Sequence, residues 1–444
     1  MWREGYENAR SLAFIYHTLF YILREKKRRA MSEINYIETQ AAALPRCSEE
    51  YGELLRLRQR KHWHEMTEYL LERCVRDREK GANLFGFNAE ERQLNLVELY
   101  HNFLTKFESR LNQMSLVLLL AEFARQFYAY NSGEQAYKPS EIREAIAFLT
   151  PLLDKKDRLG PSAHTVLRLK VAELNLLLGG EDAKAVKDVL EEVTASSLSM
   201  VEGSGSEAVV KSHYHRVGCK YYKSFGPAAK FYSEALQFLA YTPHEALPAD
   251  EQRSLAVDMS LAALLSDGAA SYNFGEVLAQ PLLGILKGTD VEFLIDLLSA
   301  FNEGDIAAYE RITAEMGDAM RVHAAALVSG EASSDLHQKV RLMALVRIVF
   351  QRPPEDRNIS YATIAEACRV EIEQVEWLLM RAMSLGLVKG TIDGVQETVQ
   401  ITWLKPRVLD AQQIRQLGEK LDNWTANVHN TLTFVENETP EMFQ

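Results

Sequence analysis

Apolar residues recur along most of this chain at intervals of three and four positions, which is the spacing of one face of an α-helix. The pattern predicts antiparallel helices in succession, and each pair takes about 35 to 40 residues, the period of tetratricopeptide-like solenoids. Such arrays bury a continuous core between neighbours and offer a long surface that usually holds partners. The expected helices span residues 33–43, 51–75, 95–111, 114–130, 141–153, 163–178, 183–193, 209–225, 228–239, 252–265, 274–280, 291–302 and 306–316.

A compact arrangement of helices and strands begins near residue 336. Its first helix is apolar around most of its circumference and ends at Pro353 and Pro354, because proline cannot donate to the helical ladder. Ser360 matches an N-cap for the next helix, and Gly386 a C′ residue for the one after it. A helix, a helix-turn-helix and a hairpin in this order are typical of a winged helix. The expected elements are helices over 339–350, 361–368 and 372–385 and strands over 387–392 and 399–403.

A last helix carries a narrow apolar stripe. Asp410 and Gln413 match a capping box at its start. Seven apolar residues then follow at spacings of 3, 4, 3, 4, 4 and 3, close to the heptad seam of a coiled coil. Either this helix folds back on its own domain, or its stripe packs against helices of other chains. The stripe consists of Ile414, Leu417, Leu421, Trp424, Val428, Leu432 and Val435.

Two segments interrupt the helical pattern. Residues 196–207, with Gly203 and Gly205, are expected to be a flexible connection, and residues 329–335 a second loose segment. The predicted fold is therefore an all-α helical-repeat solenoid followed by a winged-helix module with a small β-hairpin and a C-terminal helix. The predicted parts are an N-terminal extension (1–30), a helical arm (31–208), a second helical part (209–335), the winged helix (336–405) and a C-terminal bundle helix (409–437).

The first thirty residues differ from the rest, with seven Lys or Arg against three Glu. Their apolar run, residues 11–23, is too short to span a bilayer. Its positive charges follow it, whereas those of a signal peptide precede the apolar region. The segment reads as an amphipathic lead helix, as a basic nuclear signal, or as residues upstream of a native start at Met31. We favour the last of these interpretations.

Composition narrows the class of protein. The 444 residues are 47% hydrophobic and 25% charged, which is normal for a globular protein of two or more domains. The formal net charge of −12 argues against a general nucleic-acid binder and gives no support to binding of anionic membranes. Four cysteines lack CxxC spacing, so we expect a reduced cytosolic or nuclear setting without disulfides or a zinc site.

The second helix of the predicted helix-turn-helix would be the recognition helix if the module bound DNA. Its first turns carry Glu371, Glu373 and Glu376, where base contacts would be made, and Arg381 is its only basic residue. Carboxylates repel phosphates, and the affinity of DNA-binding proteins comes largely from Lys and Arg. The sequence therefore argues against nucleic acid as the partner.

A search for catalytic chemistry finds no recognisable signature. The sequence contains no Gly-Lys dipeptide of a P-loop, no GxSxG elbow and no HExxH. His215 and Cys219 can share a helix face near His213, but two ligands make an incomplete zinc site. His62 and His64 point to different faces of a helix. We therefore expect no enzyme, no cofactor and no bound metal.

Lys405 and Arg407 follow the last strand directly. They either anchor the last helix to the acidic surface of a neighbouring protein or form a solvated basic turn. Both interpretations remain open at the level of sequence.

Several segments resemble one known family. Residues 220–223 (KYYK) and 231–239 (FYSEALQFL) resemble the helical half of a PCI domain. Others narrow the resemblance to PCI subunits of the lid of the proteasome regulatory particle, and the similarity runs from about residue 210 to 437. These segments are 247–252 (LPADEQ), 273–276 (NFGE), 293–305 (FLIDLLSAFNEGD), 387–393 (LVKGTID) and 403–410 (WLKPRVLD).

This resemblance implies a non-catalytic scaffold that supports ubiquitin-dependent protein degradation in the cytoplasm and nucleus. Such subunits join side by side through their winged helices and gather their C-terminal helices into a bundle. The expected partners are other lid PCI subunits in a hetero-oligomer, without nucleic acid or membrane, and the expected interface is Lys405, Arg407 and the stripe. The alternatives are a PCI scaffold of the COP9 signalosome or of initiation factor three, or a nucleic-acid-binding winged-helix protein.

Overall fold

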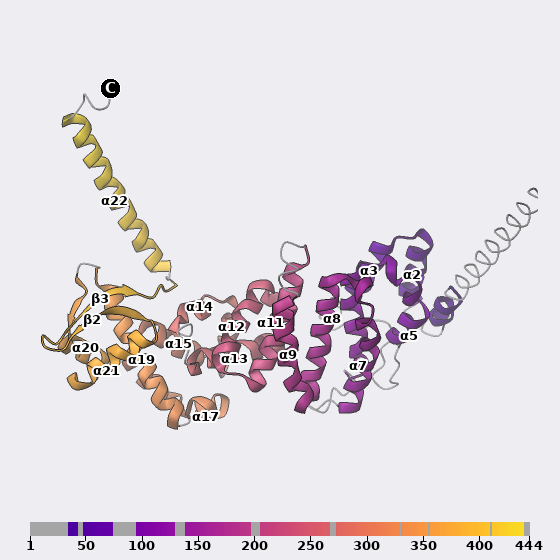
Figure 1. The fold of residues 1–444 in the computed structure, drawn as a ribbon, viewed down its shortest axis with the longest axis horizontal. Coiled ribbons are helices and arrows are strands. Elements are labelled where there is room, and N and C mark those ends of the chain that lie inside the picture. The colour runs from indigo at the N-terminus through magenta and orange to yellow at the C-terminus, as the bar shows by residue number, and fades with distance from the viewer. Residues whose placement is uncertain are drawn as a thin grey trace, which may run out of the picture. The chain divides into compact units, whose positions relative to one another are not determined.

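The computed structural model describes residues 34–42, 48–73, 95–128, 138–196, 205–266, 272–328, 330–353, 356–408 and 411–438. These residues are mostly helical, with one small sheet near the C-terminal end (Figure 1). The chain separates into two units, residues 1–224 and 225–444. The predicted extension over residues 1–30 and most of the predicted connection over 196–207 lie outside the described residues.

The first unit is a stack of helices. Helix α8 packs against both α7 and α9, and also against α6. The large side chains Tyr51, Phe103 and Phe123 are fully buried in a core that spans helices from α2 to α8. The predicted solenoid is thus confirmed in its architecture. Beyond a helix over residues 34–42, the helices are α2 (Ser48–Arg60), α3 (Trp63–Leu71), α5 (Asn95–Asn102), α6 (Gln113–Arg125), α7 (Pro139–Leu153), α8 (Lys156–Leu178), α9 (Gly180–Ser196) and α11 (Glu207–Phe225).

Two helices that the periodicity predicts as single elements are broken. Residues 51–75 contain α2 and α3, because Lys61 adopts a left-handed conformation with a φ of 60° and the backbone closes a Schellman motif there. Residues 95–111 contain α5 and two 3₁₀ turns, Leu104–Lys106 and Glu108–Arg110. The apolar spacing continues through both breaks, and neither contains the Gly or Pro that usually marks the end of a helix.

The second unit begins with further helices, and one prediction about them is wrong. Residues 330–335 are not a loose segment but the first turns of the long helix α19. Small polar residues are common both in loops and at the start of helices, so composition did not separate the two. The helices are α12 (Ala228–Tyr241), α13 (Ala249–Leu265), α14 (Phe274–Leu278), α15 (Phe293–Glu303), α16 (Ile306–Glu315), α17 (Gly317–His323), α18 (Ala325–Val328) and α19 (Gly330–Gln351).

The close approach of α15 and α19 depends on a glycine. Gly304 ends α15 with a φ of 65°, and a Cβ added there would lie 2.7 Å from the backbone of Met343 and Ala344. Any other residue at this position would force the two helices apart. Contacts between α13, α15 and α19 then place the winged helix directly on the helical part of the unit.

The winged helix has the predicted order of elements and one additional strand. The elements are β1 (Asn358–Ser360), α20 (Tyr361–Cys368), α21 (Ile372–Ser384), β2 (Val388–Asp393) and β3 (Thr398–Leu404). The strands form an antiparallel sheet in the order β1-β3-β2. Three residues are too few to show an alternating pattern, which explains why β1 was not predicted.

The structure can be compared with two predictions about helix ends in this module, the N-cap at Ser360 and the C′ glycine at Gly386. Ser360 precedes α20 as predicted, but its hydroxyl contacts the hydroxyl of Thr363 at 3.0 Å and does not cap the helix backbone. Gly386 ends the second helix in the left-handed conformation that the sequence predicted, with a φ of 65°. In the hairpin, a Cβ on Gly390 would lie 2.2 Å from the carbonyl oxygen of Gln400, so the bulge beside it requires glycine.

Candidate functional site

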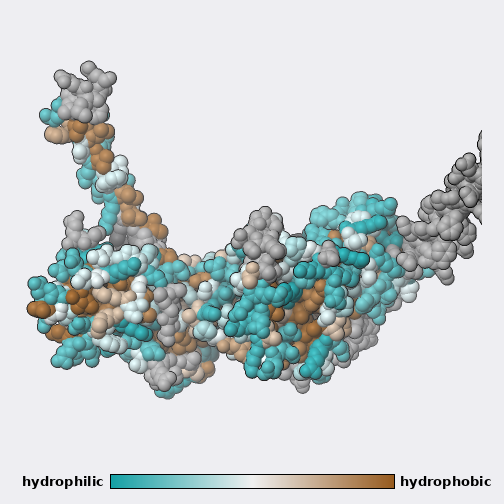
Figure 2. Space-filling model, in the orientation of Figure 1, coloured by the Kyte–Doolittle hydropathy of each residue, from teal (hydrophilic) through white to brown (hydrophobic). Residues whose placement is uncertain are grey.

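The last helix, α22 (Ala411–Glu438), carries the predicted stripe on its surface. Figure 2 shows brown, hydrophobic residues along this helix among hydrophilic neighbours. Trp424 is 66% exposed, and each of the seven stripe residues is at least 38% exposed. The described residues of the chain therefore leave this stripe largely exposed. Asp410 of the predicted capping box lies outside the described residues.

An exposed apolar stripe of this length is unusual on a protein surface that faces water. Single exposed apolar residues are normal, whereas contiguous ones mark sites of association. Gly418, Thr425 and Thr431 lie beside the stripe at helical spacing, and so does the charged Lys420. A helix with an apolar seam of this spacing is suited to packing with other helices.

The segment that leads into α22 is attached to the helical part of the same unit. The guanidinium of Arg407 donates from Nη2 to the carbonyl oxygen of Asn302 and, at 2.9 Å, to its side-chain oxygen. The backbone N–H of Val408 donates to Oδ1 of Asn273 at 3.4 Å, and Nδ2 of Asn273 donates to Glu276 at 2.6 Å. We call this attachment the linker seat.

A glycine makes room for the linker seat. A Cβ added to Gly275 would lie 3.0 Å from the Cβ of Val408, which is tighter than ordinary van der Waals contact. Two segments that carry the family resemblance, residues 273–276 and 403–410, thus meet in space although they are far apart in the sequence. Val408 contacts Asn273 and Gly275 of the first segment, and Arg407 binds Asn302 of a third one, residues 293–305.

The structure gives Arg407 a contact within its own chain. This side chain is half-buried, and burial lowers the pKa of its guanidinium from the usual value. It binds Asn302 of its own chain, so it is not part of a solvated turn. Lys405 is also half-buried, and its backbone N–H donates to the carbonyl of Leu387 at 2.9 Å. A contact of Lys405 or Arg407 with a neighbouring protein stays a prediction.

A buried lysine, which the sequence analysis missed, joins the winged helix to the rest of the unit. Lys339 of α19 is 4% exposed, and its ammonium donates to the carbonyl oxygens of Ala263, Leu264 and Ser266 at 2.8, 3.1 and 2.8 Å. These carbonyls belong to the C-terminal end of α13, where the helix dipole also favours a cation. A single Lys at the start of an apolar helix gives no signal of this role.

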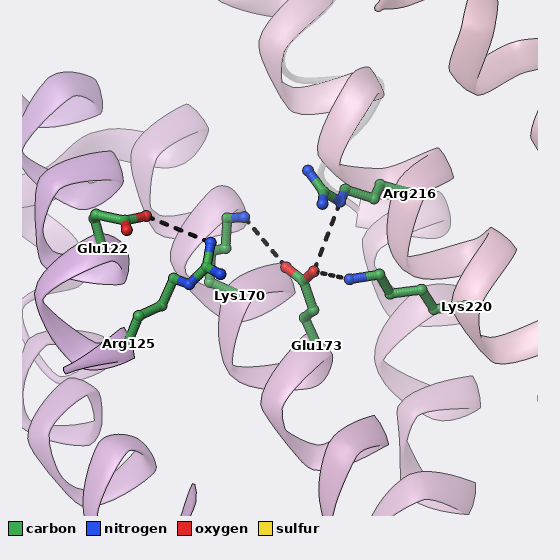
Figure 3. Close-up of polar contacts among 6 residues, drawn as sticks. All are labelled: Glu122, Arg125, Lys170, Glu173, Arg216 and Lys220. Atoms are coloured by element: carbon green, nitrogen blue, oxygen red, sulfur yellow. Dashed lines mark hydrogen bonds and ion pairs between the residues drawn. The ribbon is translucent and has the colours of Figure 1, made fainter. Parts of the chain in front are cut away.

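In the first unit, a polar cluster surrounds Glu173 of α8. Figure 3 shows Lys170 on the same helix and two cations of α11, Arg216 and Lys220, directed to its carboxylate. Lys170 lies 3.2 Å and Arg216 3.7 Å from it. Burial opposes ionisation of Glu173, but the three cations outweigh it and hold the pKa of the carboxyl well below its usual range. The cluster connects α8 to α11.

His213 of α11 lies near the charges of this cluster. Burial, followed by the positive charge of Lys170, lowers the pKa of His213 to about 3, so the ring is neutral at pH 7. The described residues contain no group of three or more His, Cys, Asp or Glu placed to hold a metal ion. His62 lies in the break before α3 and contacts Glu65 at 2.9 Å. The prediction that His62 and His64 lie on the same helix is therefore wrong. Among the described helices, none combines the length and apolar character needed to cross a bilayer.

Comparison with known proteins identifies the relatives of this chain. The family model described as PSD13 N-terminal repeats matches residues 50–298, and the PCI domain model matches residues 315–403. The chain is 34% identical to the 26S proteasome non-ATPase regulatory subunit 13 homolog A of Arabidopsis thaliana, over 93% of this chain and 99% of that protein. It is 29% identical to the 26S proteasome non-ATPase regulatory subunit 13 of Dictyostelium discoideum, over 92% and 98%.

A more distant similarity covers less of the molecule. The chain is 30% identical to eukaryotic translation initiation factor 3 subunit M of Aspergillus clavatus, over 46% of this chain and 42% of that protein. The full-length similarity therefore lies with the regulatory subunits, and the partial one with the initiation-factor subunit.

Proposed function

This chain belongs to the family of the 26S proteasome non-ATPase regulatory subunit 13, and we propose from this premise that it is a structural scaffold subunit of the regulatory particle lid. In this role it supports assembly of the particle and thereby ubiquitin-dependent protein degradation. The observation that carries the proposal is the exposed stripe of α22, which no described residue of the chain covers. In a scaffold subunit, this stripe is buried in the assembly.

The proposed interface consists of the α22 stripe and the winged helix, with Lys405 at its edge. Partner helices would cover the stripe, because apolar side chains at heptad-like spacing pack as knobs into the holes of a facing helix. The linker seat supports this role, since Arg407 and Val408 hold the start of the tail against the helical part of the unit. The expected partners are other PCI subunits of the lid in a hetero-oligomer.

We propose that the chain contributes no catalysis of its own and acts in the cytoplasm and nucleus with the proteasome. The family resemblance and the interaction surfaces support this role. The acidic start of α21 weighs against nucleic acid as a partner, since Glu371, Glu373 and Glu376 would face the phosphates.

Affinity purification of the tagged chain, with quantitative mass spectrometry of the proteins that accompany it, tests the proposal. Lid and ATPase subunits in near-equal amounts are the expected result. Subunits of initiation factor three or of the COP9 signalosome in their place would move the scaffold role to another complex. Recovery of the tagged chain alone would contradict a scaffold role, and a salt-dependent gel shift of DNA would then test the nucleic-acid alternative.

A further inference from the structure

Helix α21 turns a mixed apolar and acidic face to solvent. Trp377 and Met380 are 55% and 51% exposed and lie one helical turn apart. Glu373 precedes Trp377 by four residues, and Glu376 precedes Met380 by four, so both carboxylates share the face with the apolar pair. The opposite side of the helix is buried in the module through Val375, Leu378, Leu379 and Ala382. We call the group of Glu373, Glu376, Trp377 and Met380 the α21 face.

The carboxylates of this face are not paired within the described part of the chain, and the one basic residue of the helix, Arg381, is exposed one turn beyond Trp377. Neither Glu373 nor Glu376 forms an ion pair with another described residue. The nearest basic residue before the helix, Arg369, already binds Glu310 at 2.8 Å. An acidic group that belonged to an internal network would have a cation beside it, as Glu173 does.

The acidic character extends to the hairpin. The hydroxyl of Tyr361 is buried and has no hydrogen-bond partner among the described residues. Burial raises the pKa of Tyr361, and the carboxylates of Glu376, Asp393 and Glu397 raise it further. Carboxylates of α21, of the end of β2 and of the β2–β3 turn thus add to the negative charge near Tyr361.

We propose that the α21 face docks a basic amphipathic segment of a partner protein, with apolar residues of that segment on Trp377 and Met380 and its Lys or Arg side chains on Glu373 and Glu376. The exposed aromatic provides a centre of the kind that dominates interface energies, and the carboxylates provide charge complementarity. The inference concerns the same module as the proposed scaffold function and rests on it.

The charge pattern also discriminates between possible occupants. A nucleic acid would bring phosphates against Glu373 and Glu376, which is unfavourable. A second copy of this chain, paired through the same face, would bring carboxylates against carboxylates. A lipid surface with anionic headgroups meets the same repulsion. A basic peptide alone satisfies both the apolar and the acidic parts of the face.

The test is a titration of the full-length chain with a fluorescently labelled helical peptide that carries Leu on one face and Lys on the other. A peptide with Glu in place of Lys is the matched probe. We expect the Lys peptide to bind and the Glu peptide not to bind. Trp377→Ala should weaken binding at least about tenfold, as loss of a hot-spot residue does. The double variant E373Q/E376Q should weaken binding and flatten its salt dependence, because the screened interactions are removed.

Two controls locate the binding site. Phe434→Ala removes an aromatic on α22 that is 63% exposed, and Glu419→Gln removes an exposed carboxylate of the same helix. Neither should change the affinity. Equal binding of both peptides, or unchanged affinity in both α21 variants, would overturn the inference. So would binding of duplex DNA or self-association that Trp377→Ala abolishes.

These variants, together with a change in the α22 stripe, distinguish failure of this inference from failure of the proposed function. Incorporation of each variant into the lid is measured in parallel by co-purification. Loss of incorporation on changing the α22 stripe, with peptide binding unaffected by the α21 variants, would leave the scaffold function standing and refute the α21 docking site. Peptide binding that depends on the α21 face in a chain that never joins the lid would refute the scaffold function instead.

Discussion

The double variant L421A/W424A should lose incorporation into the lid while its own fold persists. Trp424 is 66% and Leu421 54% exposed. A Trp side chain offers on the order of 200 Å², so about 130 Å² of it remains to be buried, worth about 3 kcal/mol at roughly 25 cal/mol per Å². About half of the burial energy of a Leu adds roughly 1 kcal/mol. The expected total of about 4 kcal/mol corresponds to about a thousandfold in a dissociation constant.

The assay compares tagged wild type and variant by the fraction that co-purifies with lid subunits. Circular dichroism of the isolated chain should show unchanged helicity, because both residues are exposed and Ala has the higher helix propensity. Phe434→Ala is the matched control, since Phe434 is 63% exposed on α22 but lies outside the stripe. Normal incorporation of L421A/W424A would refute the reasoning, and so would an equal loss in F434A.

Three further changes test other parts of the structure. Gly275→Ala places a Cβ 3.0 Å from Val408, so it should speed hydrogen exchange at the Val408 amide and lower the unfolding free energy by about 1–3 kcal/mol; unchanged exchange would contradict the linker seat. Lys339→Met leaves three carbonyls without their donor, so urea denaturation should show a loss of about 3 kcal/mol or more. Since burial lowers the pKa of His213 from 6.5 to about 3, its contribution to stability is present above pH 6.5 and is lost as the pH falls toward 3. His213→Leu should therefore flatten the dependence of Tm on pH in this window, and an unaltered slope would count against a buried neutral ring.

Periodicity predicted the parts of this molecule that depend on one face of one element. The helices of the solenoid and the stripe of α22 follow directly from apolar spacing, and the left-handed Gly386 follows from its place after a helix. The periodicity did not reveal the break at Lys61, because a helix can end in a left-handed residue other than glycine. A lysine is common inside helices, so the identity of residue 61 did not indicate a helix end.

The spacing of apolar residues could not predict polar contacts between residues that are far apart in the sequence. Arg407 and Asn302 are 105 residues apart, and Lys339 lies 73 to 76 residues from the carbonyls it binds. A Lys or Arg at a turn or a helix start is normally a surface residue. Only the fold brings such a side chain to carbonyls that lack a helical partner. The sequence motifs around Asn273 and Arg407 indicated a family, but their meaning as a linker seat required the structure.

The linker seat and the α22 stripe support the same function in two different ways: the stripe provides the contact, and the seat lowers the cost of ordering it. An exposed apolar stripe gives affinity only after the cost of ordering it has been met. Arg407 and Val408 are held by Asn302 and Asn273 shortly before the helix begins, so the segment that precedes the stripe is already attached in the free chain. Preorganisation of this kind lowers the entropy lost on assembly. A change at Gly275 should therefore weaken incorporation through a site that touches no partner, whereas a change at Trp424 should weaken it through the contact itself.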